Sequence, residues 1–475
     1  MSSPRHTPAF LATTATGLVF AVALLRGLAP FFEPDVWWHL RVGEHILDSH
    51  ELYGPDPWAR FADKPYMATQ WLTEAVAAQV YRWTGLGGVL WLRTVAILAM
   101  ALLVYAACRR LGGRLPAALA SGAAVLGASA SLNPRPQLVS FVLFALVLHA
   151  WLSTVQDLRP RWWLVPVFWL WACCHGLWMF GILLGVVTSL ALVPRAVRMG
   201  TLRTHLTRSA ALHAASVAVV ALTPLGPRLL LAPFTVAGNA AGVAEEWAPT
   251  PVSNAFAITT VGAIVATAVC WLLRPSRRPM WQYAWLGLAV VLTLSMWRLV
   301  PLGAILTAPL LCSGLQGVLT GDREGVTRRE RRGLVAGVVA AALVAALACV
   351  GPHGRTAFGY PEGMRAIDTA LDHAAPHSVV MADFGVSGWL LYAHPELTPA
   401  ADLRMEAYSP AYLARYLDAG NAKPGWQAFV DGVGARYALV ERTSAIGDAL
   451  AHERGWRTVA TSAQFVLMAA PGVGE

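Results

Sequence analysis

The stretch FFEPDVWWHLRVGEHI, residues 31–46, lies where the first long apolar run of the chain ends. That run covers about 9–31, and a helix needs roughly 20 such residues to cross the hydrocarbon core of a bilayer. Glu33 and Asp35 come directly after it, beside two tryptophans. The stretch therefore predicts a transmembrane helix with a polar site at its exit, and residues from Glu44 on are expected to form a solvated helix face.

The composition places the whole chain in the membrane class. Of 475 residues, 56% are hydrophobic and only 13% are charged, and the mean hydropathy is +0.51. Soluble domains carry about 25% charged residues. The net charge of +9 comes largely from short arginine-rich loops, which are topology signals in membrane proteins, so we expect no nucleic-acid partner.

Eleven apolar segments are expected to be membrane spans, which predicts an all-α polytopic domain. They cover 9–31, 86–107, 115–131, 137–155, 162–175, 177–194, 209–225, 252–273, 280–297, 299–318 and 333–351. The first is expected to be a membrane helix and not a cleaved signal peptide, because Arg26 interrupts it and no small-residue cleavage pattern follows.

The loops between these segments predict an orientation. Five of them are basic, at 108–114, 159–161, 195–208, 274–278 and 323–332. Basic loops face the cytoplasm. With eleven spans and Arg5 inside, all five fall on that side, so the N-terminus is expected to be cytoplasmic. The loop 32–85 and the tail after 352 are then outside.

The tail from about 355 onward has no apolar spans and more charge. Helix-like and strand-like patterns alternate there, at 361–374, 378–384, 408–419, 424–435 and 436–441, before a last helix and a strand pair. This alternation predicts a small α/β domain. We therefore expect two domains: 1–352 in the membrane, with the first outer loop 32–85, and 353–475 as an extracytoplasmic α/β domain.

Motifs for nucleotides, zinc and disulfides do not stand out in the chain. No GxGxxG follows a strand pattern, and there is no P-loop. The six cysteines fall in or beside apolar runs without a CxxC motif. We therefore expect no disulfide framework and no zinc site.

Ionisable residues recur at every expected outer turn. After Glu33 and Asp35 they include Arg135, His175, Arg228, Glu246 and Arg298. Short outer loops are normally depleted in basic residues, and polar groups near the bilayer are costly and often mark a cavity. These helix ends are therefore predicted to share one pocket at the outer leaflet.

The residue types in this predicted pocket suggest a chemistry. A carboxylate such as Asp35 can act as a general base toward a hydroxyl group. The arginines can make charge-assisted hydrogen bonds to a phosphate. Trp37, Trp38, Trp58 and Trp71 are candidates to stack on a sugar, and His39 is a further candidate for substrate binding. Together they suggest a lipid phosphate carrier with a polar, saccharide headgroup.

Each candidate has a structural alternative. Asp35 can cap the helix that follows it, the tryptophans can anchor the loop at the interface, and His175 can belong to a packing turn. Arg228 and Arg298 can extend to lipid headgroups. Glu246 can be one of an exposed pair of loop glutamates.

The chain resembles a group of bacterial polytopic membrane proteins along nearly its whole length. Their first outer loop reads like PDxWWHLxxGxxI, then DPFS and HEWL, and the counterparts here are EPDVWWHLRVGEHIL, DPW and QWLTE. Further likenesses are RPQL (135–138), HG (175–176), TPLGPRLLLAP (223–233), EEWAP (245–249), RLVPL (298–302) and the tail motifs ADFGVSGWLLY and ADLRMEAYSPAYLARYL.

That group is similar in turn to the GT-C superfamily of glycosyltransferases, which use polyprenyl-phosphate sugars. The resemblance implies a GT-C-like fold in the bacterial cytoplasmic membrane. An acidic residue after the first span serves GT-C enzymes as catalytic base or as a metal and substrate ligand, and it maps onto Asp35, with Glu33 second. A divalent metal is compatible with the resemblance, and the outer domains of such enzymes often help to bind the acceptor.

The chain departs from the group's pattern at three places. HEW is here TQW, with Gln70 in place of the carboxylate, which leaves Asp56 and Glu74 as substitutes for a second acid. NPYG has become TPLG at 223–226. The DGR of the tail has become ADLR, which keeps Asp402 and Arg404. These changes allow a changed substrate or a lost activity.

Two functions follow from the sequence. The first is an inverting glycosyltransferase of the outer leaflet that transfers a sugar from a polyprenyl-phosphate carrier to a glycan, lipid or protein acceptor. The second is a non-catalytic scaffold or transporter for lipid-linked saccharide. A transporter should carry an internal repeat and polar residues at the bilayer midplane, and neither is found in the sequence.

Overall fold

The computed structural model describes residues 9–31, 33–240, 245–251, 253–319, 325–350 and 363–473. The chain forms two compact units. We call 1–29, 84–233 and 244–355 the helical unit, and 30–83, 234–243 and 356–475 the sheet unit. Arg5 and the expected domain boundary at 352 lie outside the described residues.

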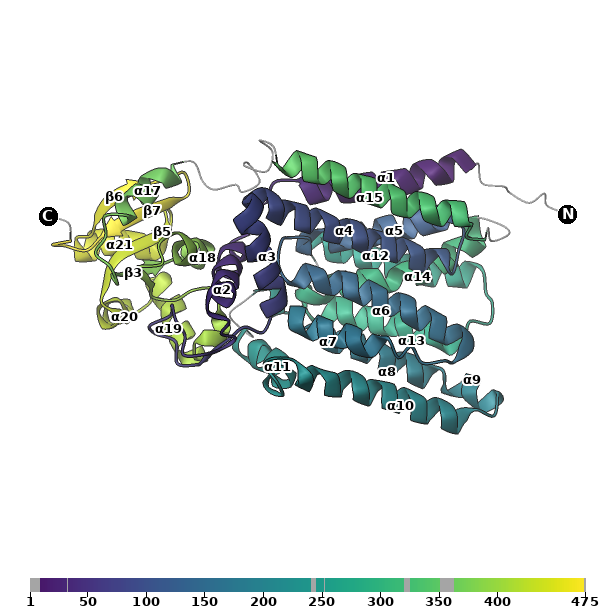
Figure 1. Ribbon diagram of the computed structural model, residues 1–475. Helices are drawn as coiled ribbons and strands as arrows, with labels where there is room; N and C mark the ends of the chain where they lie inside the picture. The colour runs from purple at the N-terminus through teal and green to yellow at the C-terminus, as the bar shows by residue number, and fades with distance from the viewer. Residues whose placement is uncertain are drawn as a thin grey trace. The chain divides into compact units, whose positions relative to one another are not determined.

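All eleven predicted apolar segments are helical (Figure 1). Their helices are α1 (Ala9–Leu28), α4 (Leu86–Arg109), α5 (Arg114–Ala128), α6 (Gln137–Asp157), α7 (Leu164–Cys174), α8 (Trp178–Ala191), α10 (Leu202–Ala218), α12 (Ala255–Leu273), α13 (Met280–Ser295), α14 (Val300–Leu319) and α15 (Arg328–Val350). In the described part of the chain, eight helices are long and apolar enough to cross a membrane when 178–198 and 202–222 are each counted as one continuous helix, whereas α5, α7 and α13 are shorter than a span. The chain is a multi-pass membrane protein.

Shorter elements connect these helices. They are α9 (Val193–Arg198), α11 (Arg228–Ala240) and the 3-10 turns η1 (Ser129–Ser131), η2 (Val219–Leu222), η3 (Glu245–Trp247) and η4 (Trp297–Leu299). Helical turns satisfy backbone groups within the segment, which the hydrocarbon region demands because it offers no water.

Helix α14 forms the centre of the helical unit. Every residue from Val300 to Cys312 is buried, and α14 packs against α5, α12 and α13. Small residues allow this close approach. A Cβ at Gly127 on α5 would collide with the Thr260 side chain and lie 3.0 Å from Ala304 on α14.

The two ends of the helical unit carry different polar groups. At one end, buried Arg109 of α4 donates to Glu330 of α15 over 2.6 Å. The C-terminal end of α6 also lies there, where Gln156 accepts from Arg110 over 2.9 Å. Arg135 precedes the N-terminal end of this 21-residue helix, which rises about 31 Å. Arg135 therefore lies at the end opposite to this basic cluster.

The tail of the sheet unit forms the predicted α/β domain (Figure 1). Its sheet has the order β4 (Thr398–Pro399), β3 (Val379–Ala382), β5 (Ala435–Glu441), β7 (Phe465–Ala469) and β6 (Arg457–Thr461). Strand β3 pairs in parallel with β4 and β5, whereas β7 runs antiparallel to β5 and β6. The other elements are α17 (Met364–Leu371), α18 (Phe384–Ala393), η5 (Met405–Ala407), α19 (Pro410–Gly420), α20 (Trp426–Val433) and α21 (Ala445–Arg454). The predicted α/β fold is confirmed.

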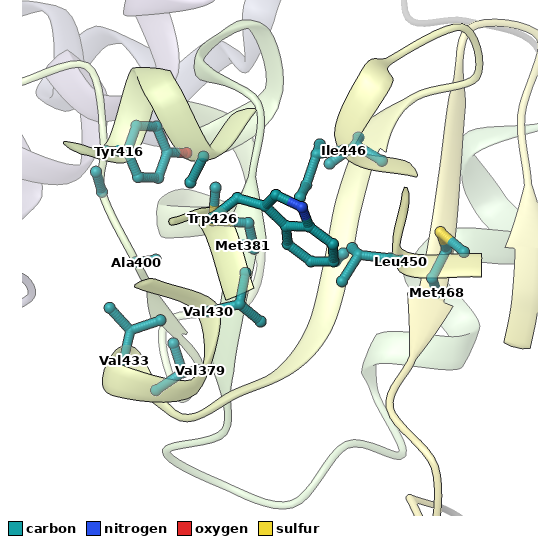
Figure 2. Close-up of a cluster of buried hydrophobic side chains, with 14 of the residues drawn as sticks. Val379, Met381, Ala400, Tyr416, Trp426, Val430, Val433, Ile446, Leu450 and Met468 are labelled. Carbon is teal, nitrogen blue, oxygen red and sulfur yellow. The ribbon is translucent and has the colours of Figure 1, made fainter. Parts of the chain in front are cut away.

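The apolar core of this domain surrounds Trp426. Figure 2 shows its indole between Met381 of β3 and Leu450 of α21, and the Trp426 side chain is only 4% exposed. All four residues of β3 are buried, as a strand covered on both faces requires.

Residues 33–83, most of the segment predicted as the first outer loop, also belong to the sheet unit. This segment forms α2 (Asp35–Ser49), β1 (Tyr53–Gly54), β2 (Tyr66–Met67) and α3 (Trp71–Thr84). Helix α2 packs along α18, and the Tyr392 hydroxyl donates to Glu44 over 3.1 Å. The expectation of a solvated face from Glu44 on is wrong at Glu44 itself, because α18 covers it, whereas the Asp48 and Glu51 side chains are largely exposed.

Candidate functional site

Four predicted site residues lie together at one end of the helical unit. Arg298 in η4 donates from Nη1 to Oε1 of Glu246 over 2.6 Å, and Arg135 donates to Oε2 of the same carboxylate over 3.0 Å. Nη2 of Arg298 lies 3.1 Å from Nε2 of His175. One glutamate therefore bridges two arginines, with a histidine beside them, and we call these four residues the arginine cluster.

Neighbouring turns hold Arg298 in place. The side-chain amide of Gln137, the first residue of α6, donates to the Arg298 carbonyl oxygen over 3.3 Å. The backbone N–H of Trp297 donates to the Ala248 carbonyl over 3.2 Å and so ties η4 to the segment after η3. The Arg298 guanidinium also lies over the Trp247 ring, 4.9 Å from its centroid, in a cation–π contact.

His175 is fixed in the turn between α7 and α8. A guanidinium can only donate, so Nε2 of His175 accepts from Arg298 and the ring proton lies on Nδ1. Nδ1 lies 3.0 Å from Ser140 Oγ, which also accepts from the Trp171 indole over 2.8 Å. The backbone N–H of Leu177 also lies 3.3 Å from Nδ1, but a protonated Nδ1 cannot accept from it. These contacts orient the imidazole beside Arg298.

Arg228 differs from the other two predicted arginines in its exposure. It is the first residue of α11 and its side chain is exposed, whereas Arg135 and Arg298 are half-buried. Helix α11 reaches the His175 turn, because a Cβ at Gly176 would lie 3.4 Å from Pro233.

Asp35 is the first residue of α2 in the sheet unit. Its Oδ1 accepts from the indole N–H of Trp38 over 3.2 Å. The N-cap position of α2 is Pro34, so Asp35 lies one residue inside the helix, where a carboxylate interacts favourably with the helix dipole. Glu33 is buried, and its backbone carbonyl accepts from the N–H of Val36 over 3.2 Å.

Both tryptophans after Asp35 are buried against other rings. Trp37 is 8% exposed and its ring lies 5.2 Å from that of Tyr392 on α18. Trp38 is 7% exposed and lies 3.6 Å from the His39 ring. In this arrangement they orient the start of α2 and offer no open ring face to a sugar.

His39 faces Glu74, one of the substitute acids. Nδ1 of His39 lies 2.9 Å from Oε1 of Glu74, and both side chains are buried. Burial raises the pKa of the Glu74 carboxyl, against the opposing effect of the hydrogen bond with His39. Glu74 is thus already engaged in holding α3 to α2.

The other substitute acid, Asp56, is paired with the tail. Arg404 donates to Asp56 over 2.7 Å and to Asp402 over 2.7 Å, and the Tyr408 hydroxyl donates to Asp402 over 3.0 Å. All three charged side chains are at most 4% exposed. The DPW and ADLR motifs therefore meet in one buried ion triad.

The carboxyl of Glu406 interacts electrostatically with Asp35. Burial raises the pKa of Glu406, Arg404 lowers it, and the negative charges of Asp402 and Asp35 raise it further. Glu406 and Asp35 are thus electrostatic neighbours within the sheet unit.

Arg93 is a buried cation that the sequence patterns did not single out. It lies within the span α4, is 1% exposed, and donates to the carbonyls of Leu132 over 2.7 Å and Ala29 over 2.8 Å. Arg26 similarly donates to the Ser129 carbonyl over 2.9 Å. A charged residue inside an apolar run often marks a functional or structural site. Here Arg93 holds the chain directly after α1, at Ala29, six residues before Asp35.

The acidic and histidine side chains do not gather as metal ligands in the described part of the chain. There, no group of three or more His, Cys, Asp or Glu side chains is arranged to hold a metal ion.

Comparisons with known proteins show a likeness in fold only. Neither a protein-family model nor a curated protein matches the chain. The oligosaccharyltransferase AglB of Archaeoglobus fulgidus, in complex with an inhibitory peptide and a dolichol-phosphate, aligns with a TM-score of 0.56 at 11% identity, over 91% of this chain and 70% of that one. A second structure of that organism's oligosaccharyltransferase, tethered to an acceptor peptide, gives 0.54 at 11% identity, over 91% and 69%.

ArnT also aligns along nearly its whole length. ArnT of Cupriavidus metallidurans, bound to undecaprenyl phosphate, gives a TM-score of 0.48 at 15% identity, over 97% of each chain. The AglB likeness shows that this chain has a GT-C-like fold, as the resemblance of its motifs implies.

Proposed function

We propose that the protein is a membrane glycosyltransferase. It transfers a sugar from a polyprenyl-phosphate carrier to a glycan, lipid or protein acceptor of the cell envelope, such as a polysaccharide, at the outer face of the membrane. The observation that carries this proposal is the arginine cluster, in which two arginines converge on one carboxylate at the end of an apolar helix bundle. The likeness in fold to AglB, whose structure contains a dolichol-phosphate, supports this proposal.

The arginine cluster suits the phosphate of a lipid carrier. Guanidinium groups bind carboxylate and phosphate oxygens with the same donor geometry. Glu246 already shows that an anion with two oxygens can accept from Arg135 and Arg298 together. An apolar bundle beside the cluster leaves the polyprenyl chain in lipid while its phosphate reaches the arginines.

Asp35 has the role of general base in this proposal. The acceptor hydroxyl oxygen forms a bond to the anomeric carbon of the sugar, and the bond from that carbon to the carrier phosphate oxygen breaks. The electron pair leaves with the phosphate, and the acceptor proton goes to Asp35. A single displacement inverts the anomeric configuration. Trp38 orients the Asp35 carboxylate, and Glu33 is the second candidate acid.

The proposed orientation rests on the basic loops. The end of the helical unit with Arg109 and Arg110 is proposed to face the cytoplasm, together with the N-terminus. The arginine cluster is at the opposite end and is then extracytoplasmic, as is the C-terminal domain. The membrane is proposed to be the bacterial cytoplasmic membrane.

Binding of a short carrier lipid to the Arg298→Gln variant tests the phosphate assignment. Titration of the detergent-solubilised protein with farnesyl monophosphate should show affinity reduced about tenfold to a hundredfold, because a hydrogen bond to a charged group contributes about 1.5–3 kcal/mol. Arg161→Gln is the matched control, since Arg161 also forms one ion pair, with Asp157 over 2.9 Å. Equal affinities for the two variants would refute the phosphate site.

A further inference from the structure

A groove lies between α1 and α15 and begins at the basic end of the helical unit. Its cavity measures about 560 Å³, a size within the range of ligand pockets. We propose that it binds one anionic phospholipid of the surrounding membrane, whose acyl chain lies in the groove and whose phosphate contacts Arg329. This inference goes beyond the proposed function, because the arginine cluster lies at the opposite end of the unit.

Three helices form the groove. Helices α1 and α15 both pack on α4, and Leu98 and Tyr105 of α4 line the groove between them. On α15 the lining residues are Glu330, Gly333, Leu334, Gly337, Val338 and Ala341. Residues three and four apart are neighbours on a helix surface, so this set is one stripe and the groove runs along the helix.

The groove has the length of about one leaflet. From Glu330 to Ala341 the stripe rises about 17 Å, which is about half of a hydrocarbon core of roughly 30 Å. Only 22% of the membrane-spanning window of α1 and 11% of that of α15 are buried inside the protein. Both helices therefore face lipid, and an acyl chain of the leaflet on the basic side can fill the groove along its length.

Glycines on both walls keep the groove open. A Cβ at Gly17 of α1, or at Gly333 or Gly337 of α15, would meet nothing within 4 Å. They differ in this from Gly127, where a Cβ would collide with a neighbouring helix. Close helix packing does not require these three glycines, and larger side chains in their place would occupy the groove.

The hydroxyl groups that line the groove already have hydrogen-bond partners. The Thr16 hydroxyl donates to the Ala12 carbonyl over 2.8 Å, and the Tyr105 hydroxyl lies 3.3 Å from Thr16 Oγ1 and can donate to it. An apolar chain can therefore lie against Thr16 and Tyr105 without leaving a buried polar group unsatisfied.

Arginines lie at the end of the groove where a lipid headgroup would meet water. Arg114 and Arg329 line this end, and the Arg329 side chain is exposed. The carboxylate of Glu330, which also lines the groove, accepts from Arg109 over 2.6 Å. A guanidinium donates charge-assisted hydrogen bonds to phosphate oxygens, and one such group within reach is sufficient to favour an anionic lipid.

The test measures binding of phosphatidylglycerol, and of phosphatidylcholine with the same acyl chains, to the purified full-length protein by native mass spectrometry. The wild type should bind the anionic lipid about fivefold more tightly, the effect of one arginine near a membrane surface, and Arg329→Gln should lose this preference. Gly337→Phe fills the groove and should weaken binding of both lipids at least about tenfold, because acyl methylene groups lose their burial. The control Gly287→Phe adds the same ring to α13, where a Cβ also meets nothing within 4 Å, and should bind as the wild type does.

Thermal unfolding gives a second readout. Phosphatidylglycerol should raise the Tm of the wild type and of Gly287→Phe, but not of Gly337→Phe or of Gly17→Phe, which fills the groove from the opposite wall. Equal lipid binding by Gly337→Phe and Gly287→Phe would overturn the groove as the site. Equal affinity of the wild type for the two lipids would overturn the headgroup contact. Displacement of phosphatidylglycerol by the same concentration of farnesyl monophosphate would show that the groove holds the carrier lipid and would contradict the proposed occupant.

Discussion

Replacing Gly388 with alanine tests whether the tail positions the segment that carries Asp35. A Cβ at Gly388 on α18 would lie 2.6 Å from the carbonyl oxygen of Pro34, the residue before Asp35. Ordinary van der Waals contact begins at 3.4 Å, so α18 and the start of α2 must separate by about 0.8 Å. A backbone oxygen cannot rotate away as a flexible side chain can.

Two effects of known size follow from this displacement. Overpacking a well-packed contact costs roughly 1–3 kcal/mol of stability. A displacement of about 1 Å at a reacting group can reduce catalysis about a hundredfold. We therefore expect Gly388→Ala to reduce sugar transfer about tenfold to a hundredfold although no reacting atom is changed.

Gly385 on the same helix provides the matched control. A Cβ there meets nothing within 4 Å, and alanine in a helix is favoured over glycine by up to about 1 kcal/mol. Transfer of labelled sugar from a polyprenyl-phosphate donor is measured in membranes that contain each variant, and hydrogen exchange is followed in peptides from 33–49. Gly388→Ala should transfer slowly and exchange faster over the first turn of α2. Equal transfer and exchange in the two variants would refute the positioning by α18.

Two further predictions concern buried charges of the sheet unit. Arg404→Met leaves Asp56 and Asp402 buried without their cation and should destabilise the sheet unit by about 3–5 kcal/mol. The control Arg82→Met removes the partner of an exposed carboxylate and should have little effect on stability. Native-state proteolysis measures both variants, and an equal loss of stability in the two would contradict this prediction. Burial raises the pKa of Glu74 above its ordinary 4.5, so the folded state binds this proton more tightly than the unfolded state, and the stability from this group is lost as pH rises above 4.5 through the raised value. Glu74→Gln imitates the protonated form and should exceed the wild type in thermal stability above that window and not below pH 4.5; an advantage confined to low pH would show that the sign is wrong.

Local patterns in the sequence were sufficient for the architecture. Each of the eleven apolar segments became a helix because hydrophobic length alone separates a span from a loop. The tail was predicted equally well, since the buried strand at 379–382 and the helices after it have clear periodicities. The short helices α5, α7 and α13 show that apolar character predicts a helix better than it predicts its length.

Local patterns could not predict which side chains pair with each other across the chain. Asp56 and Arg404 are 348 residues apart, and Glu246 lies 111 residues from Arg135 and 52 from Arg298. The residue types of these arginines indicated phosphate ligands, but nothing local indicated that Glu246 would bridge them. The contact of Gly388 with Pro34 likewise depends on helix packing, which only the tertiary structure defines.

Transfer by the Asp35→Asn variant tests the central claim most directly. Membranes from a deletion strain that expresses the variant, the wild type or the control Asp48→Asn are supplied with labelled polyprenyl-phosphate sugar. Asp48 lies on the same helix with an exposed side chain, so its loss should leave transfer unchanged. Without its general base, Asp35→Asn should lose at least about a hundredfold in rate. Transfer by Asp35→Asn at the wild-type rate would contradict the assignment of Asp35 as the catalytic base.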